Sequence, residues 1–235
     1  MHRTGHVRGR GGPLVVAGVS GGVGASTLAA LLAQERSRAG RVVLMDLGAG
    51  GGLDVLLGLE RVPGARWPDL DGLHGAVAPQ DLDGLLPRWR SVEVLSASRH
   101  GAPPGVDAVA EVVDAFRGAG AFVVVDAAQR GGTRREVAAR VAGELLLVAG
   151  QDVLGLAAVL AARRTVDGLG AQLVLRRRPS RISPDELAHV ADLPLVGLLP
   201  HDRRLPDAVD RGLGPVAGGR LRRAVVAIDR RLGRQ

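Results

Sequence analysis

The sequence predicts an α/β fold in three layers, with a mostly parallel central sheet and helices on both faces. Short, wholly apolar runs of strand length alternate with segments of helical periodicity, and no internal repeat is apparent. Strands that are apolar along their whole length are typical of parallel sheets, because both faces of such a sheet are buried. Ligands in these folds bind at the carboxyl ends of the strands, so residues at those ends are candidate functional residues.

The apolar runs give the order of the expected strands. In chain order they are Leu14–Val19, Arg41–Met45, Glu93–Ser96, Ala121–Val125, Glu144–Val148, Gln172–Leu175 and Leu195–Leu199. Two of these runs are followed directly by an aspartate, Asp46 and Asp126. Because the carboxyl ends of parallel strands share one edge of the sheet, we expect both carboxylates at that edge.

Helices are expected between these strands. Apolar spacing predicts helices near 27–38, 105–117 and 153–166, and two more after the last strand. Ser183, Pro184 and Glu186 have the spacing of a capping box with proline in the first turn, and Thr133 with Glu136 repeats the capping-box spacing. The segment 50–87 is rich in Gly, Pro and Asp, and we expect it to be the least regular part of the chain.

Composition limits the class of protein. The 235 residues are 46% hydrophobic, which suffices for one sizeable core, so we expect a disordered basic tail at 1–12 and a single domain at 13–235. The chain has no cysteine, which excludes disulfides and thiolate metal sites. It has no apolar run of the length that a membrane span needs and no signal-peptide pattern, so we expect a cytoplasmic protein.

The net charge of +7 leaves two interpretations open. An excess of cations is found in proteins that bind nucleic acid or acidic membranes. The chain, however, contains no Lys, Asn or Tyr and is rich in Ala, Gly, Arg, Leu and Val, which is what a GC-rich coding sequence produces. We favour the codon-usage interpretation, which leaves nucleic acid as the weaker candidate partner.

A glycine-rich turn follows the first expected strand and opens the first expected helix. It reads Ser20-Gly21-Gly22-Val23-Gly24-Ala25-Ser26-Thr27. Such a turn directs backbone N–H groups and a helix N-terminus at one point, where they bind phosphate. The alternative is a tight turn that needs glycine only for its geometry. The glycine spacing also fits the short-chain dehydrogenase fingerprint, but that class relies on a catalytic Tyr and Lys, and the chain contains neither.

The turn resembles the deviant Walker A loop of the ParA/MinD ATPases, usually K-G-G-V-G-K-[ST]-T. Further segments resemble that superfamily in the same order, namely Val42–Asp46, Gly50–Gly58, Phe122–Asp126 as the Walker B strand, Glu144–Val148 with Gln151–Val153, and Leu193–Asp202. The chain is therefore similar to a ParA/MinD-type P-loop protein. The loop and Gly50–Gly58 are most similar to the CpaE-like group, which includes septum-site-determining proteins.

The resemblance implies a nucleotide site with ATP or ADP and Mg²⁺. It assigns nucleotide binding to Gly21, Gly22, Val23, Gly24, Ala25, Ser26 and Thr27, Mg²⁺ binding to Ser26 and indirectly to Asp126, and catalysis to Asp46 and Asp126. Three positions depart from the superfamily pattern. Ala25 replaces the lysine that reaches the β- and γ-phosphates, Ser20 the signature lysine that reaches a dimer partner's nucleotide, and Gly48 an aspartate that helps orient water. We therefore expect weak or absent ATP hydrolysis, unless an arginine such as Arg130 substitutes.

Two classes of function follow from the resemblance. One is a nucleotide-binding protein that forms a homodimer and positions septum or Tad-type pilus and secretion machinery, peripherally at the inner face of the membrane. The other is a nucleotide-independent scaffold that binds a partner. The last expected helix carries an apolar stripe among arginines, formed by Leu221, Val225, Ile228 and Leu232. This stripe could bind anionic lipid or pack on the domain, and we favour packing.

Overall fold

The computed structural model describes residues 12–48, 52–70, 83–97, 104–127 and 143–232, together with 136, 140 and 141. The expected tail lies outside the described residues except for Gly12, which lies against Gly143. Arg130 and Thr133 also lie outside the described residues, so the expected capping box with Glu136 stays a prediction.

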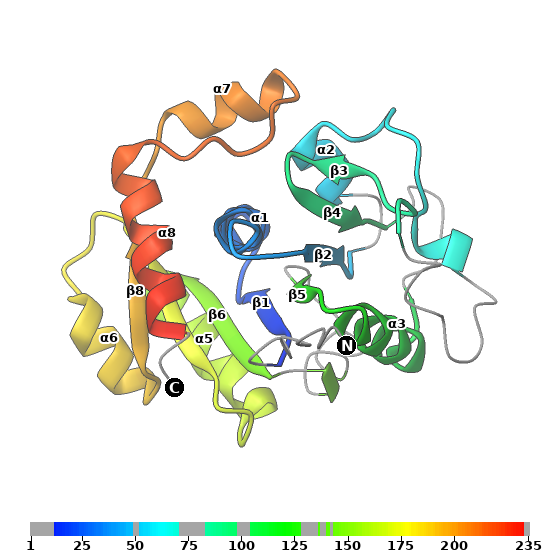
Figure 1. Cartoon of the computed structure of the whole chain (residues 1–235). Helices are drawn as coiled ribbons and strands as arrows, with labels where there is room; N and C mark the ends of the chain where they lie inside the picture. Colours follow the sequence, from blue (N-terminus) through cyan, green and yellow to red (C-terminus); the bar gives the residue numbers. More distant parts are fainter. Residues whose placement is uncertain are drawn as a thin grey trace, which may run out of the picture.

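The strands form one eight-stranded sheet in the order β3-β4-β2-β5-β1-β6-β7-β8 (Figure 1). Their bounds are β1 Leu14–Gly18, β2 Val42–Asp46, β3 Arg88–Trp89, β4 Val92–Leu95, β5 Phe122–Asp126, β6 Glu144–Gly150, β7 Gln172–Arg176 and β8 Leu195–Leu199. Every neighbouring pair is parallel except β3 and β4, which are antiparallel. The expected α/β fold with a mostly parallel sheet is confirmed.

Helices cover both faces of this sheet. Among the described residues the helices are α1 Ala25–Arg36, α2 Gly52–Leu57, α3 Val106–Gly118, α5 Val153–Val166, α6 Pro184–Ala191, α7 Arg204–Asp210 and α8 Gly219–Leu232, with a 3-10 turn, η1, at Trp67–Leu70. Apolar side chains of α1, α2 and α8 share one core layer, and those of α3, α5 and α6 share the other. The three expected layers are therefore present.

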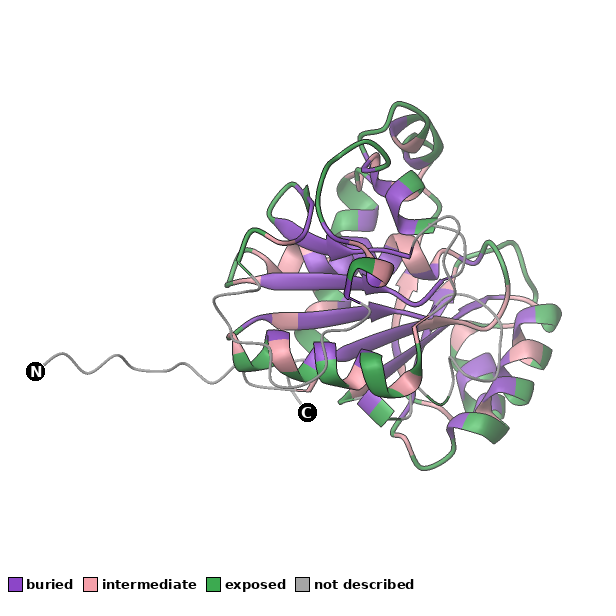
Figure 2. Ribbon diagram, turned by 90° about the vertical axis from the view of Figure 1, so that its right-hand side faces the viewer, coloured by how far each residue is buried: buried purple, intermediate pink, exposed green. Residues whose placement is uncertain are grey.

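The strands are mostly apolar because alternate side chains enter different layers. In β1, Leu14 and Val16 belong to the layer under α1, while Val15 belongs to the layer under α3 and α5. Figure 2 shows the buried strands between helices whose outer faces are exposed. Burial on both faces removes the alternation of polar and apolar residues that a half-exposed strand would show.

Several helices and strands lie where local sequence patterns predicted them. Helix α5 and strand β8 have the expected bounds. The capping box at α6 is also present, since Glu186 N donates to Ser183 Oγ at 3.1 Å and Ser183 N donates to Glu186 Oε2 at 3.4 Å. The first helix, expected from about Thr27, begins two residues earlier at Ala25, because Gly24 already makes the turn into it.

The apolar stripe of α8 packs on the domain. Leu221, Val225, Ile228 and Leu232 are all buried in the layer that contains α1. Close approach is possible because Gly197 in β8 has no side chain, and a Cβ there would lie 2.4 Å from Cγ1 of Ile228. Arg36 of α1 and Asp229 of α8 form an ion pair beside this contact. The packing interpretation of the last helix is therefore confirmed.

We expect Ile228→Ala to lower the free energy of unfolding by about 2–5 kcal/mol, because truncating a buried isoleucine removes apolar contacts and leaves a cavity. Urea denaturation would measure the change. Arg222→Ala, on the exposed side of the same helix, should stay within about 0.5 kcal/mol of wild type. An equally small loss for Ile228→Ala would contradict the packing of α8.

The partial burial of the Glu144 carboxylate makes the stability of the fold depend on pH. Glu144 opens β6, and its Oε2 atom is buried without a hydrogen-bond partner among the described residues. Burial raises the pKa of this carboxyl above its usual value near 4.5, the Arg36 guanidinium lowers the pKa, and the Asp229 carboxylate raises it. The folded state therefore holds this proton to a higher pH than the unfolded state does, so stability falls as pH rises through that window.

Glu144→Gln should abolish this part of the pH dependence. We expect the variant to have a higher melting temperature than wild type at about pH 8, with the difference shrinking towards about pH 4, where Glu144 is protonated in both states. Thermal melts across this pH range would measure it. The same change at the exposed Glu111 is the matched control. A variant that is less stable than wild type at high pH would show that the electrostatic attraction of Arg36 outweighs the burial cost.

Candidate functional site

The carboxyl ends of β1, β5 and β2 lie side by side. In the sheet register Asp46 of β2 pairs with Asp126 of β5, and Asp126 also pairs with Val16 of β1. The glycine turn leaves the sheet directly after β1 and leads into α1. The structure thus brings the turn and both aspartates to one edge, as the sequence predicted.

The glycine turn has the backbone geometry of an anion-binding loop. Gly22 and Gly24 have positive φ angles of 70° and 96°, which side-chain-bearing residues rarely adopt. Gly24 is the N-cap of α1, and no side chain caps the helix. Within the described part of the chain, no acceptor is found for the amides of Ala25, Ser26 and Thr27. These donors and the positive end of the α1 dipole point at the mouth of the turn.

Side chains of the turn differ in exposure. Gly21 and Gly22 are exposed, Ser26 and Thr27 are partly exposed, and Val23 and Ala25 are buried at 1% and 3% exposure. The hydroxyls of Ser20, Ser26 and Thr27 make no hydrogen bond to the described residues. Val23 therefore fixes the turn to the core, while Ser26 keeps a hydroxyl that can ligate a metal ion.

Asp46 has a structural task in this conformation. Its Oδ1 accepts a hydrogen bond from Gly48 N at 2.6 Å, and its Oδ2 accepts one from Leu53 N at 3.1 Å. The backbone carbonyl of Asp46 accepts from Trp67 Nε1 at 2.7 Å. The carboxylate therefore ties the segment after β2 to the start of α2. Its expected catalytic assignment stays a proposal, since both oxygens bind backbone amides here.

Gly48 is required by this arrangement. A Cβ at position 48 would lie 2.6 Å from Oδ1 of Asp46, well inside van der Waals contact. In this conformation a side chain at position 48 would require the Asp46 carboxylate to shift. The absence of the superfamily's aspartate at 48 is thus coupled to the placement of Asp46.

The site fits Mg²⁺ only together with a ligand that brings its own oxygens. Asp126 is buried at 3% exposure at the end of β5, and Ser26 lies in the first turn of α1. In the described residues no group of three or more His, Cys, Asp or Glu side chains could hold a metal alone. Mg²⁺ commonly takes one or two protein ligands and completes its octahedron with phosphate and water. The donor set therefore suits a Mg-nucleotide.

An arginine that the sequence analysis did not single out lies against the turn. Arg176 is the last residue of β7, and a Cβ placed on Gly24 would lie 3.1 Å from its Nη1 atom. The sequence signal was present, because Arg176 follows the apolar run 172–175 at the same carboxyl edge as Asp46 and Asp126. Its approach to a loop two strands away depends on the strand order, which no local pattern gives.

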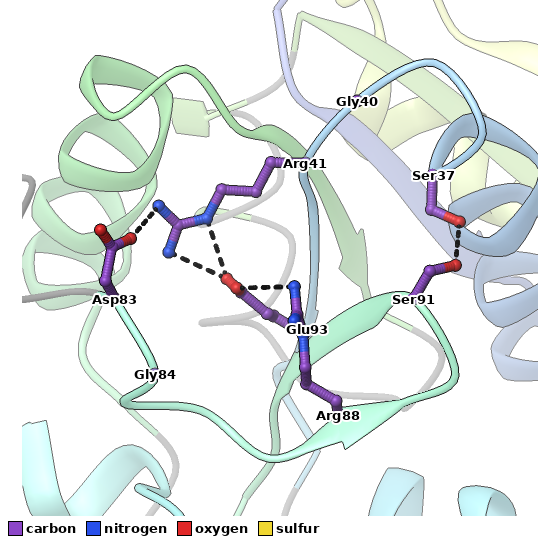
Figure 3. A pocket seen from close by; sticks show the side chains of 8 residues that line it. All are labelled: Ser37, Gly40, Arg41, Asp83, Gly84, Arg88, Ser91 and Glu93. Carbon is purple, nitrogen blue, oxygen red and sulfur yellow. Dashed lines mark hydrogen bonds and ion pairs between the residues drawn. The ribbon is translucent and has the colours of Figure 1, made fainter.

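A cavity lined by charged groups lies at the opposite edge. It has a volume of about 540 Å³ and is lined by the residues before β2 and around the β3–β4 hairpin (Figure 3). Its charges satisfy one another, since Glu93 accepts from Arg41 at 3.0 Å and from Arg88 at 3.4 Å, and Asp83 pairs with Arg41 at 2.8 Å. This cavity offers no uncompensated charge for a ligand, so the candidate site is the carboxyl edge.

The chain has both curated relatives and structural neighbours. No protein-family model matches the chain. An uncharacterized protein of Mycobacterium tuberculosis strain H37Rv is 34% identical over 220 residues, which cover 92% of this chain and 61% of that protein. A protein of strain CDC 1551 matches equally. The chain thus spans about three fifths of the length of these relatives.

Solved structures share the fold. The MinD cell division protein of Aquifex aeolicus matches with a TM-score of 0.74 and 20% identity, covering 95% of this chain and 97% of that one. A ParA family ATPase of Chlorobium tepidum gives 0.73 and 16%, with 96% and 93% covered. The septum site-determining protein MinD of Pyrococcus horikoshii, complexed with Mg-ADP, gives 0.72 and 19%, with 94% and 96% covered. The chain therefore has the ParA/MinD-type P-loop fold.

We expect Gly48→Ala to destabilise the protein by about 1–3 kcal/mol, because the added methyl displaces the Asp46 carboxylate from the amide of Gly48. Chemical denaturation would measure the change. Gly40→Ala is the matched control, since a Cβ there meets nothing within 4 Å. Equal stabilities of the two variants would contradict the hydrogen bond to Asp46.

Proposed function

We propose that this chain is a ParA/MinD-type protein that binds Mg-ATP or Mg-ADP at the turn 20–27, with weak or absent hydrolysis. The observation that carries this proposal is the set of unaccepted amides at Ala25, Ser26 and Thr27, which open towards the edge that holds Asp126. Backbone amides at a helix N-terminus bind phosphate without any side chain. Ser26 and Asp126 supply the direct and the indirect Mg²⁺ contact.

The missing lysines set the strength of binding. Removing one partner of a close charge pair costs about 2–5 kcal/mol, which is a factor of tens to thousands in affinity. Ala25 and Ser20 offer no charge to the phosphates, and the chain contains no lysine elsewhere. We therefore propose dissociation constants for Mg-nucleotide of about micromolar to millimolar.

Hydrolysis suffers more than binding. Phosphoryl transfer depends on positioning and on stabilising the charge that spreads over the transferred group. At this edge Asp46 is engaged by two backbone amides, and Gly48 leaves no side chain to orient water. Turnover close to background is the consequence, with Asp126 as the remaining catalytic carboxylate.

The biological task that we propose is the positioning of septum or Tad-type pilus and secretion machinery through a nucleotide-controlled homodimer. Support comes from the resemblance of the loop and of Gly50–Gly58 to CpaE-like and septum-site-determining proteins. The structural neighbours include proteins described as cell division and septum site-determining MinD, one of them in a MinC:MinD complex. Partner proteins of such machinery are the proposed binding partners.

We propose a cytoplasmic location without insertion of α8 into lipid. No helix in the described ranges combines the length and apolar character that a membrane span requires. The apolar stripe of α8, which an anionic membrane would need, is buried against α1 and β8. Peripheral attachment would then have to use the exposed arginines of α8 alone or a partner protein.

A nucleotide-independent scaffold on the same fold is the second candidate. Ala25, Ser20 and the close contact between Gly48 and Asp46 favour it, because each removes a group that nucleotide chemistry uses. The two candidates differ in one measurable property, the affinity for Mg-nucleotide.

Ala25→Lys tests the proposal. An ammonium at the start of α1 should tighten Mg-ATP binding by at least tenfold, about 1.4 kcal/mol, because it adds a charge-assisted contact to a loop that still binds phosphate. Turnover should recover much less, because Ser20 and Gly48 are unchanged. Isothermal titration calorimetry and a phosphate-release assay would measure the two effects.

Ala25→Met is the matched control, since it adds similar length without charge. No heat and no thermal shift with wild type at millimolar Mg-ATP, together with no gain in Ala25→Lys, would favour the scaffold. Wild-type turnover well above background would instead contradict the electrostatic account of weak hydrolysis.

A further inference from the structure

Arg176 places its guanidinium beside the glycine turn. It closes β7 at the carboxyl edge of the sheet, where its backbone pairs with Gly150 of β6 and Leu199 of β8. Its Nη1 atom lies 3.1 Å from the position that a Cβ of Gly24 would occupy. The glycine at 24 is favoured by its positive φ, and a side chain there would also require the guanidinium to move by a few tenths of an ångström.

No carboxylate in the described residues pairs with Arg176. Its one polar side-chain contact there is from Nη2 to Nδ1 of His201, at 3.5 Å. The side chain is partly exposed, and its partial burial lowers its pKa, with the nearby Arg178 adding to the effect. Arg178 itself is paired with Asp152 at 2.7 Å. Arg176 thus carries the cost of a partly desolvated charge without an anion to offset it.

The charge of Arg176 lies beside backbone amides of the turn that have no hydrogen-bond acceptor among the described residues. The amides of Ala25, Ser26 and Thr27 open at the N-terminus of α1, and the guanidinium lies against Gly24, which directly precedes them. An anion that accepts from these amides would lie beside a cation that lacks a counter-charge.

We propose that Arg176 contacts the phosphate groups of the nucleotide and supplies, from β7, the positive charge that Ala25 no longer provides at the start of α1. The proposal rests on the proposed nucleotide-binding function. A guanidinium donates two parallel hydrogen bonds to phosphate oxygens, which an ammonium cannot do. Binding an anion would also offset the cost of burying Arg176.

Arg176→Gln tests this contact with Mg-ATP and with Mg-pyrophosphate as probes in calorimetric titrations. We expect at least a tenfold loss of affinity for both probes, because pyrophosphate retains the groups that Arg176 would bind. Arg177→Gln makes the same change of net charge at an exposed residue with no ion pair among the described residues, and should lose less than threefold. Arg176→Lys keeps the charge and should retain part of the affinity.

A double-mutant cycle distinguishes a contact between Arg176 and the phosphates from a general loss of nucleotide affinity. A lysine introduced by Ala25→Lys would share the same phosphate oxygens with Arg176, so its gain should be larger in the Arg176→Gln background than in wild type. Thermal melts of each variant would check folding, and Arg176→Gln should not melt below wild type because it removes a partly desolvated charge that has no ion pair among the described residues.

The outcomes separate this inference from the proposed function. Wild type that binds both probes, with Arg176→Gln binding as well as Arg177→Gln, would overturn the role of Arg176 and leave nucleotide binding intact. Wild type that binds neither probe would overturn both proposals. Equal gains from Ala25→Lys in the two backgrounds would show that Arg176 does not reach the phosphates, and would overturn the inference as well.

Discussion

The parallel register of β1, β5 and β2 is the constraint on which the candidate site depends. It fixes Asp126 between the end of β1 and Asp46, and it starts the glycine turn beside them. The register itself follows from burial, because a slip of one residue would move side chains such as Val15 and Val16 into the wrong apolar layers. The chemistry of the edge is thus held in place by the core rather than by contacts within the site.

In the proposed site, backbone groups would do most of the phosphate binding that side chains do in a lysine-bearing loop. The carboxylate of Asp46 is satisfied by two backbone amides, and the amides that open α1 face outward. Because the loop lacks lysine, a phosphate ligand would depend more strongly on these amides and on Mg²⁺. The attraction of the phosphates to the arginines at this edge would also contribute a larger share of the affinity. The position of each arginine would then matter more than the number of arginines.

Sequence patterns predicted the parts of the fold that rest on local chemistry. The continuous apolar strands, the capping box at Ser183 and the glycine turn all depend on neighbouring residues, and all are present. Helix α2 and the short strand β3 were not predicted. Helix α2 is tied by its Leu53 amide to Asp46, and β3 pairs only with β4, so both depend on contacts that sequence spacing does not record.

The candidate site, like the fold, was predicted only where it does not depend on tertiary contacts. The two aspartates and the turn were placed at one edge because parallel strands share their carboxyl ends. The engagement of Asp46 by Gly48 and the approach of Arg176 to Gly24 were missed, since each is a tertiary contact. Arg130, the arginine that sequence order pointed to, lies outside the described residues, whereas strand order brings a different arginine to the loop.

The departures from the superfamily pattern are physically connected. Asp46 binds the amide of Gly48 at 2.6 Å, so an aspartate at 48 that could orient water would require the Asp46 carboxylate to shift. Once Arg176 lies against Gly24, a cation already stands beside the turn, and a lysine at 25 would add a second like charge to the same small volume. In the proposed site, a loop that binds phosphate through backbone amides and a β7 arginine, next to an aspartate that holds the backbone, would retain a ligand without turning it over.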